Sequence, residues 1–203
     1  VKAAGPNPDN NPRLRAAMQN AKAINMPKER LEAAIKKASS KDEKDLEIIT
    51  YEGYAAHGIA VLVETVTDNP TRTVANVRSY FNKYGGSLGT SGSVSFMFDH
   101  KCNFRVKRKM DVDVDMLELE LIDVGCEELS VENDELIIYG AFDAFGKLHH
   151  YFEENQYEIV ESGFDRIPTM TKKLTPEQEI DVKKLLDKME DDDDVQDVYS
   201  TME

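Results

Sequence analysis

The sequence predicts an α+β fold with three domains: a helical N-terminal domain and two ferredoxin-like α+β domains, one inserted in the other. Apolar residues recur at helical spacing over the first 38 residues, and the period changes to that of strands from residue 46. A β-α-β-β-α-β succession follows between about 103 and 170. The predicted boundaries are 1–42 for the helical domain, 43–100 with 175–203 for a discontinuous domain, and 101–174 for the inserted one.

Two short helices joined by a tight turn are predicted at the N-terminus. Asn11 can cap the first helix, Pro12 suits its first position, and Pro27 opens the second. The two apolar stripes consist of Leu14, Ala17, Met18, Ala21 and Ile24, and then of Leu31, Ala34, Ile35 and Ala38. The run 39–45 is predicted to be a linker.

Residues 46–100 are predicted to form a hairpin, a helix and a third strand. The strands LEIITYEGY and GIAVLVETV flank a turn around His57 and Gly58. Asn69 and Pro70 open a helix whose inward side carries Val74, Val77 and Phe81. After the loop GGSLGTSG, the run SVSFMF is predicted to be a strand with Val94, Phe96 and Phe98 on one face.

The inserted module alternates strands and helices. NFRVKR is a candidate strand, and the helix DVDMLELELIDVG has its apolar residues Met116, Leu117, Leu121 and Val124 near helical spacing. A hairpin turns at Glu132, Asn133 and Asp134, a helix buries Phe145, Leu148 and Phe152, and YEIVESGFDRIP follows as a strand.

A capped helix and a short strand close the chain. Thr175, Pro176 and Gln178 begin the helix, whose apolar face holds Val182, Leu185, Leu186 and Met189. The last strand is VQDVYSTM. Because a lone helix and strand cannot hold a domain, we expect them to complete the sheet of residues 46–100, with the helix on the strand of Val61 and Val63.

Charge is strongly segregated along the chain. Up to Lys41 nine Lys and Arg stand against three Asp and Glu, which gives +6; the total of −14 leaves −20 for residues 42–203. A segregated charge lets the basic end meet a polyanion while the acidic remainder stays off it. The alternative is that these cations only solvate the outer faces of two helices.

The composition excludes several classes of protein. No run approaches the roughly 18 apolar residues of a membrane span, so we expect a cytoplasmic protein without membrane contact. We also expect a monomer. Cys102 and Cys126 form no CxxC pair and are expected to be reduced thiols. The opening VKAAG is expected to be the tail of a longer basic segment.

No catalytic or cofactor motif stands out, so we predict no enzyme activity, cofactor or metal. The glycine loop 85–92 follows a helix and precedes a strand, the reverse of a phosphate-binding loop, and is predicted to be structural. The aspartates 191–194 lack the ligand spacing of a calcium loop and are predicted to be a solvated helix end. The four histidines are scattered, and no nucleophile has a recognisable base beside it.

Two long blocks resemble the YebC/PmpR family. They are GPNPDNNPRLRAAMQNAKAINMPKERLEAAIKKA and YEGYAAHGIAVLVETVTDNPTRTVANVRSYFNKYGGSLGTSGSVSFMF, with an acidic stretch before VYSTME at the end. The resemblance implies three domains, the third inserted in the second, and a non-enzymatic regulator of gene expression that binds DNA or acts in translation with the ribosome. Ala55 and Ala56 stand where the family often has glycines, and His57 stands where it has a small residue, so the tip of this hairpin is the least transferable part of the resemblance.

Two hypotheses follow. In the first, the basic hairpin binds DNA or RNA through backbone contacts, since neither a base-reading helix nor an aromatic RNA-stacking strand is present. The candidate contacts are Arg13, Arg15, Lys22, Lys28, Lys36 and Lys37, then Arg72, Arg78 and Lys83, and, more weakly, the loop residues Gly86, Gly89, Thr90 and Ser91. In the second, the protein is a scaffold whose acidic module docks a basic protein.

Overall fold

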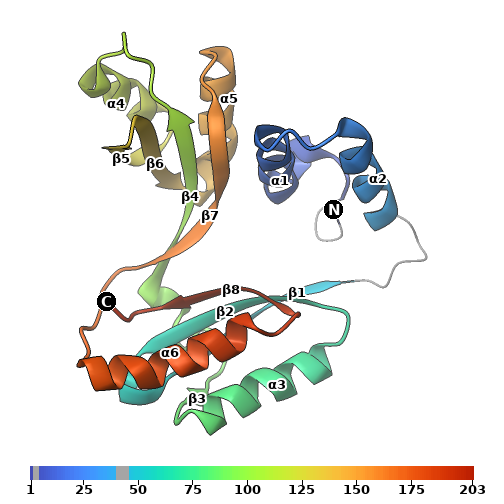
Figure 1. Ribbon diagram of the computed structural model, residues 1–203, viewed down its shortest axis with the longest axis vertical. Helices are drawn as coiled ribbons and strands as arrows, with labels where there is room; N and C mark the ends of the chain where they lie inside the picture. Colours follow the sequence, from blue (N-terminus) through green and yellow to red (C-terminus); the bar gives the residue numbers. More distant parts are fainter. Residues whose placement is uncertain (2–4, 40–45) are drawn as a thin grey trace. The chain divides into compact units, whose positions relative to one another are not determined.

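The computed structural model describes residues 1, 5–39 and 46–203, so Lys2, Lys41 and most of the predicted linker lie outside the described residues. The chain forms two compact units, Val1–Glu43 with His100–Asp165, and Lys44–Asp99 with Arg166–Glu203. Each unit holds one four-stranded sheet and helices (Figure 1), which confirms the α+β class. None of the described helices has the length and apolar content needed to cross a bilayer. The division into three domains stays a prediction.

The sheet of the first unit has the ferredoxin-like succession. Its elements are β4 (Phe98–Lys107), α4 (Val114–Asp123), β5 (Cys126–Glu132), β6 (Glu135–Ala141), α5 (Phe145–Glu154) and β7 (Ile159–Pro168). The strands lie in the order β5-β6-β4-β7, and β6 runs antiparallel to both of its neighbours. Asn133 and Asp134 both have positive φ, as a two-residue hairpin turn requires. The chain passes between the two units within β4 and again within β7.

Aromatic side chains fill the core between this sheet and its helices. Phe104 of β4 packs between Phe145 and Phe152 of α5, at ring-centroid distances of 4.9 and 5.3 Å. Leu117 and Leu121 of α4 join the same core, as predicted. Met116 does not point inward as its spacing suggested, because it lies on the outer side of α4 and is 58% exposed.

The N-terminal segment of the first unit forms the predicted helical hairpin. After the short 3-10 turn Pro8–Asn10 come α1 (Pro12–Ala23) and α2 (Lys28–Ala38), joined by a turn in which Asn25 has φ 56°. The side chain of Asn11 caps α1 by accepting the Leu14 N–H at 3.1 Å, as predicted. α2 buries none of its residues fully, so its apolar stripe is only partly covered.

The second unit is built from two segments that are separate in the sequence. Its elements are β1 (Glu47–Tyr54), β2 (Ala60–Thr67), α3 (Pro70–Lys83), β3 (Ser87–Leu88), α6 (Pro176–Glu190) and β8 (Val195–Ser200), with strand order β3-β1-β2-β8. Strand β8 pairs with β2, and α3 and α6 lie side by side on one sheet face (Figure 1). Val182, Leu185 and Met189 of α6 share a core with Val61 and Val63. The β-β-α-β-α-β succession differs from that of the first unit.

The run SVSFMF is not the predicted strand. Ser95–Met97 form a 3-10 turn, Val94 and Phe98 pack on Ala60 and Leu62, and Phe96 is 74% exposed. The carboxylate of buried Glu52 accepts the N–H groups of Gly92, Val94 and Ser95 at 2.7, 2.8 and 2.8 Å. Since these donors are occupied by a side chain, they cannot join a strand ladder.

Candidate nucleic-acid interface

Helix α1 is attached to the first unit through one face. Ala16 enters the aromatic core, and Asn20 forms two reciprocal hydrogen bonds with the backbone of Ser162 in β7, each 2.9 Å long. Because β7 is an edge strand, its backbone groups there would otherwise lack a partner inside the sheet. Asn20 therefore takes the place of a neighbouring strand at this point.

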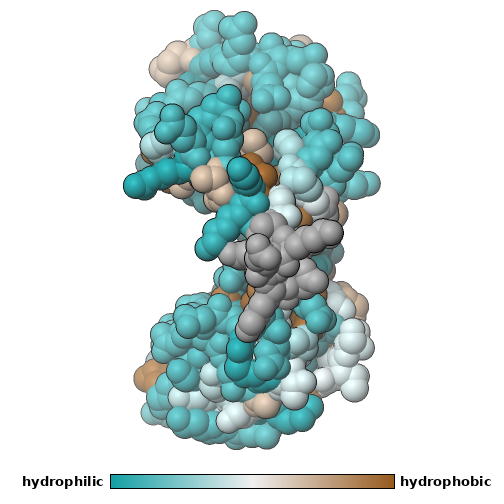
Figure 2. Space-filling model, turned by 90° about the vertical axis from the view of Figure 1, so that its right-hand side faces the viewer, coloured by the Kyte–Doolittle hydropathy of each residue, from teal (hydrophilic) through white to brown (hydrophobic). Residues whose placement is uncertain are grey.

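The cations of the hairpin lie on its outer surface. Arg13, Lys22, Lys28, Lys36 and Lys37 are all exposed, and Arg15 is partly buried. Arg15 forms an ion pair with Asp9 at 3.3 Å, and Lys28 forms one with Glu32 at 3.5 Å. Lys22 and Lys36 have no ion-pair partner among the residues that the structure describes. The visible surface in Figure 2 is largely hydrophilic, with hydrophobic side chains only in small patches.

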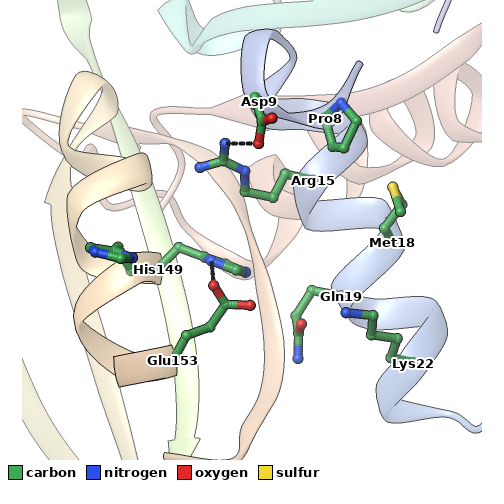
Figure 3. A pocket seen from close by; sticks show the side chains of 9 residues that line it. Pro8, Asp9, Arg15, Met18, Gln19, Lys22, His149 and Glu153 are labelled. Carbon is green, nitrogen blue, oxygen red and sulfur yellow. Dashed lines mark hydrogen bonds and ion pairs between the residues drawn. The ribbon is translucent and has the colours of Figure 1, made fainter. Parts of the chain in front are cut away.

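A cavity of about 270 Å³ lies between α1 and α5 in the first unit. Figure 3 shows α1 contributing Arg15, Met18, Gln19 and Lys22 to one side, and α5 contributing His149 and Glu153 to the other. Two of the predicted contact residues, Arg15 and Lys22, thus line the same cavity.

His149 is the buried member of this cavity. Its Nδ1 lies 3.4 Å from the Glu153 carboxylate, and its Nε2 has no hydrogen-bond partner within the described part of the chain. Burial lowers the pKa of the imidazole below its ordinary value; Arg15 and Lys22 act in the same direction, and Glu153 opposes them. With His149 largely neutral, the charged side chains that line the cavity are Arg15 and Lys22 of α1, together with the carboxylates of Asp9 and Glu153.

The three predicted cations of α3 have different surroundings. Arg72 donates to the Asp194 carboxylate from Nε, to Oδ2 at 3.2 Å, and from Nη2, to Oδ1 at 2.7 Å. Its Nη2 also donates to Asp68 Oδ1 at 3.0 Å. Burial opposes ionisation of Asp194, but hydrogen bonds from Arg72 and Thr73 outweigh it and lower the carboxyl pKa. Arg72 therefore holds α3 to the end of α6, and its charge already faces two carboxylates of the protein.

The other two α3 cations are solvent-facing. Arg78 is exposed and has no ion-pair partner among residues 5–39 and 46–203, and Lys83 lies 5.3 Å from the centroid of the Tyr84 ring. They belong to the second unit, whereas the hairpin belongs to the first.

The aspartate run is not the solvated helix end that the sequence suggested. Asp194 is buried, and Asp192 accepts hydrogen bonds from the Tyr80 hydroxyl at 2.8 Å and the Asn76 amide at 3.2 Å. These bonds tie the end of α6 to α3. No group of three His, Cys, Asp or Glu suited to a metal ion occurs within the described ranges.

The glycine loop owes its glycines to close approach and to turns. A Cβ on Gly86 would lie 2.5 Å from the Tyr54 carbonyl oxygen, and one on Gly89 would lie 2.5 Å from Ser93 Oγ. Positive φ occurs at Gly85 and Gly92 and not at Gly86 or Gly89. Thr90 and Ser91 are exposed, and nothing in their geometry marks them as contacts.

The outer face of β4 carries a further set of cations that the hypothesis did not use. Lys101 pairs with Glu127 at 3.3 Å, Arg105 with Glu135 at 3.6 Å, and Lys107 with Glu158 at 2.5 Å. Since each cation faces a glutamate, this face presents little net positive charge. Lys22 and Lys36 of the hairpin, by contrast, have no ion-pair partner among the described residues.

The site contains residues that the sequence did not reveal. His149 and Gln19 line the cavity, and Asn20 positions the helix that bears Arg15 and Lys22. In the sequence, the one sign of this cavity is the adjacent pair His149 and His150. In the structure His149 is buried and His150 is exposed.

A helical hairpin with outward cations joined to two antiparallel sheets with helices defines a multidomain α+β protein. Residues 1–41 match the family description "TACO1/YebC protein N-terminal domain", and residues 46–202 match "TACO1/YebC second and third domain". The chain belongs to the TACO1/YebC family, which confirms the resemblance found in the sequence.

Similar proteins cover the whole chain. A Flavobacterium johnsoniae protein named "Probable transcriptional regulatory protein" is 57% identical over 202 residues, which is 100% of this chain and 85% of that protein. A Parabacteroides distasonis protein of the same name is 55% identical, over 100% of this chain and 83% of its own length. The crystal structure of the conserved hypothetical protein Aq1575 from Aquifex aeolicus is 37% identical, with TM-score 0.79, over 100% of this chain and 84% of that one.

Proposed function

We propose that this protein is a non-enzymatic regulator of gene expression that binds nucleic acid through the α1–α2 hairpin. The observation that carries the proposal is the set of outward cations on a segment of net charge +6, held to the first unit by Asn20. The names of the relatives, probable transcriptional regulatory proteins, support the regulatory part. Exposed Lys and Arg suit phosphates, contacts to which position a protein without reading sequence.

The primary contacts in this proposal are Lys22 and Lys36. Both are exposed and lack an ion-pair partner in the described residues, so their charges are available to phosphate. Arg13, Arg15, Lys28 and Lys37 supplement them from the same two helices, and Arg78 and Lys83 are separate candidate contacts on the second unit. The other 162 residues, from 42 to 203, carry −20 and do not attract a polyanion in bulk.

The direct test reverses two charges. The double variant Lys22→Glu, Lys36→Glu should bind duplex DNA and single-stranded RNA of unrelated sequences more weakly, by a similar factor for each sequence. The matched control is Lys147→Glu with Lys173→Glu, which changes the net charge equally at two exposed lysines outside the hairpin. Equal loss in both double variants, or no loss in either, would remove the hairpin from the proposal.

A comparison of wild type with the same double variant can show whether DNA or the ribosome is the physiological target. Sedimentation of a cell extract separates ribosomes from the nucleoid, and wild type and the double variant are followed in both fractions. Loss of the variant from the ribosome fraction alone assigns the hairpin to translation, and loss from the nucleoid fraction alone assigns it to transcription.

A further inference from the structure

The outer side of α4 exposes three large apolar side chains in a row. Met116, Leu119 and Ile122 are 58%, 60% and 53% exposed, and residues three apart lie on one side of a helix. The opposite side of α4 already buries Leu117 and Leu121 in the core. The apolar row therefore lies outside the buried core of the unit, and we call it the α4 stripe.

A cavity of about 350 Å³ adjoins the stripe at Met116. Its apolar lining comes from Val112, Leu117 and the rings of Tyr151 and Tyr157, and its polar rim includes Lys109, Asp113, Glu120 and Asn155. The rim is ordered by internal contacts: the Tyr151 hydroxyl donates to Glu120, and Lys109 donates to the Asn155 carbonyl at 2.6 Å and lies 4.4 Å from the Tyr157 ring centroid. A cavity of this size can receive one large apolar side chain next to the stripe.

The surroundings of the stripe are acidic. Residues 110–146 contain twelve Asp and Glu and no Lys, Arg or His. On α4 itself, Asp115, Glu118 and Asp123 have no ion-pair partner among the residues the structure describes. This charge repels the phosphates of nucleic acids and anionic lipids, and it attracts Lys and Arg.

We propose that the α4 stripe is a docking surface for a basic amphipathic helix of a partner protein. The apolar face of the partner helix would pack on Met116, Leu119 and Ile122, one large side chain would enter the cavity beside Met116, and its Lys and Arg would face Asp115, Glu118 and Asp123. Methionine suits such a surface because its flexible side chain adapts to different partners. The inference goes beyond the proposed nucleic-acid function and does not depend on it, since the α4 stripe and its acidic neighbours include none of the hairpin cations.

The test uses a synthetic helical peptide of Leu and Lys with one Trp on its apolar face, about four turns long. The controls are a scrambled peptide of the same composition, which keeps the charge without an apolar face, and a peptide with Glu for Lys. Fluorescence anisotropy measures affinity for the full chain, and amide chemical shifts locate the contact. The amphipathic basic peptide should bind with shifts centred on α4, and the two controls should not.

Two variants make the test specific. Met116→Ser with Leu119→Ser should weaken peptide binding about tenfold or more, because both side chains are exposed and only their contact area is removed. The matched control is Ile180→Ser on α6, a 54% exposed apolar residue between Glu179 and Asp181, which should leave binding unchanged. A Glu118→Lys, Asp123→Lys variant should also weaken binding, most strongly at low salt.

Several results would overturn the proposal. Equal binding of the basic and scrambled peptides would mean attraction by bulk charge only. Binding that the serine variant does not change would place the contact elsewhere. Self-association of the wild type that Leu119→Ser abolishes would assign the stripe to a second copy of the chain, and amide shifts of α4 with RNA would assign it to nucleic acid.

Discussion

Asn20 on α1 and Ser162 on β7 exchange two hydrogen bonds of 2.9 Å, from the Asn20 amide to the Ser162 carbonyl and from the Ser162 N–H to the Asn20 amide oxygen. The residues are 142 positions apart in the chain. An asparagine side chain has one donor and one acceptor side by side, so it can satisfy a strand's backbone as another strand would. This pair sets the face of α1 that remains free for the cations.

Replacement of Asn20 by Ala should lower the free energy of unfolding by about 1–3 kcal/mol, because the N–H and carbonyl of buried Ser162 lose their partners. Urea denaturation measures the change. Gln19→Ala is the matched control, since its single contact to the Ile159 carbonyl is 3.5 Å long and its loss should be smaller. Equal stability of Asn20→Ala and wild type would show that α1 docks without this pair.

Salt should weaken nucleic-acid binding in a predictable way. If about four phosphates are contacted, the logarithm of affinity falls with the logarithm of salt at a slope near −3 on single strands or about −3.6 on duplex. The Lys22→Glu, Lys36→Glu variant removes two contacts, so its slope should be shallower by about 1.4–1.8. Titrations at several salt concentrations measure both. An affinity that ignores salt would argue against phosphate contact altogether.

His149 should make the first unit sensitive to mild acid. Its pKa is lowered in the folded protein, so the unfolded chain takes up a proton first as the pH falls below about 6.5. The stability associated with a neutral His149 is complete above that pH and is lost as the pH falls through the lower folded value. His149→Gln should flatten thermal stability over this range, whereas His150→Gln, an exposed control, should retain the loss. Identical pH profiles for wild type and His149→Gln would refute the assignment.

Glu52 should hold the loop 92–95 as an ionised group. Burial raises the pKa of this carboxyl, but three backbone N–H groups outweigh burial and lower it. Its stabilising effect is present above the ordinary value of about 4.3 and is lost as the pH falls through the lower folded value. Glu52→Gln should cost about 2–3 kcal/mol at neutral pH, measured by urea denaturation, because an amide replaces a charged acceptor. Glu47→Gln, at an exposed position, should cost much less.

Gly86, which is in close contact with another residue, and Gly92, which has positive φ, should respond differently to replacement by alanine. Gly86→Ala should cost about 1–3 kcal/mol through the clash with the Tyr54 carbonyl oxygen. Gly92→Ala should cost about 1–2 kcal/mol through its positive φ alone, because no atom lies within 4 Å of the added Cβ. Amide exchange should increase in β1 only for Gly86→Ala. A cost at Gly86 no larger than that of an exposed alanine substitution would exclude the clash.

Helices and the amphipathic faces within them were predictable because their signals are local. Asn11 lies three residues from the N–H it caps, and Leu117 and Leu121 are four residues apart on one helix. Helical spacing predicts both Met116 and Leu117 on the inward side of the helix, and only the position of the sheet decides that Leu117 is buried and Met116 is exposed. The alternation of the run 93–98 predicts a strand, but the Glu52 carboxylate occupies the backbone N–H groups of Val94 and Ser95.

The sequence by itself determined most of the secondary-structure succession, the separation of a basic end from an acidic remainder, and the family. These depend on residues near each other in the chain, or on composition. The tertiary structure alone decided the roles of Arg72, Asp194, His149 and Asn20. Asp194 lies 122 positions from Arg72, and Asn20 lies 142 from Ser162, so their partners are known only once distant segments pack together. A charge or an amide in a sequence has no assigned partner, and its burial and partner decide whether it stabilises the fold or remains available to bind.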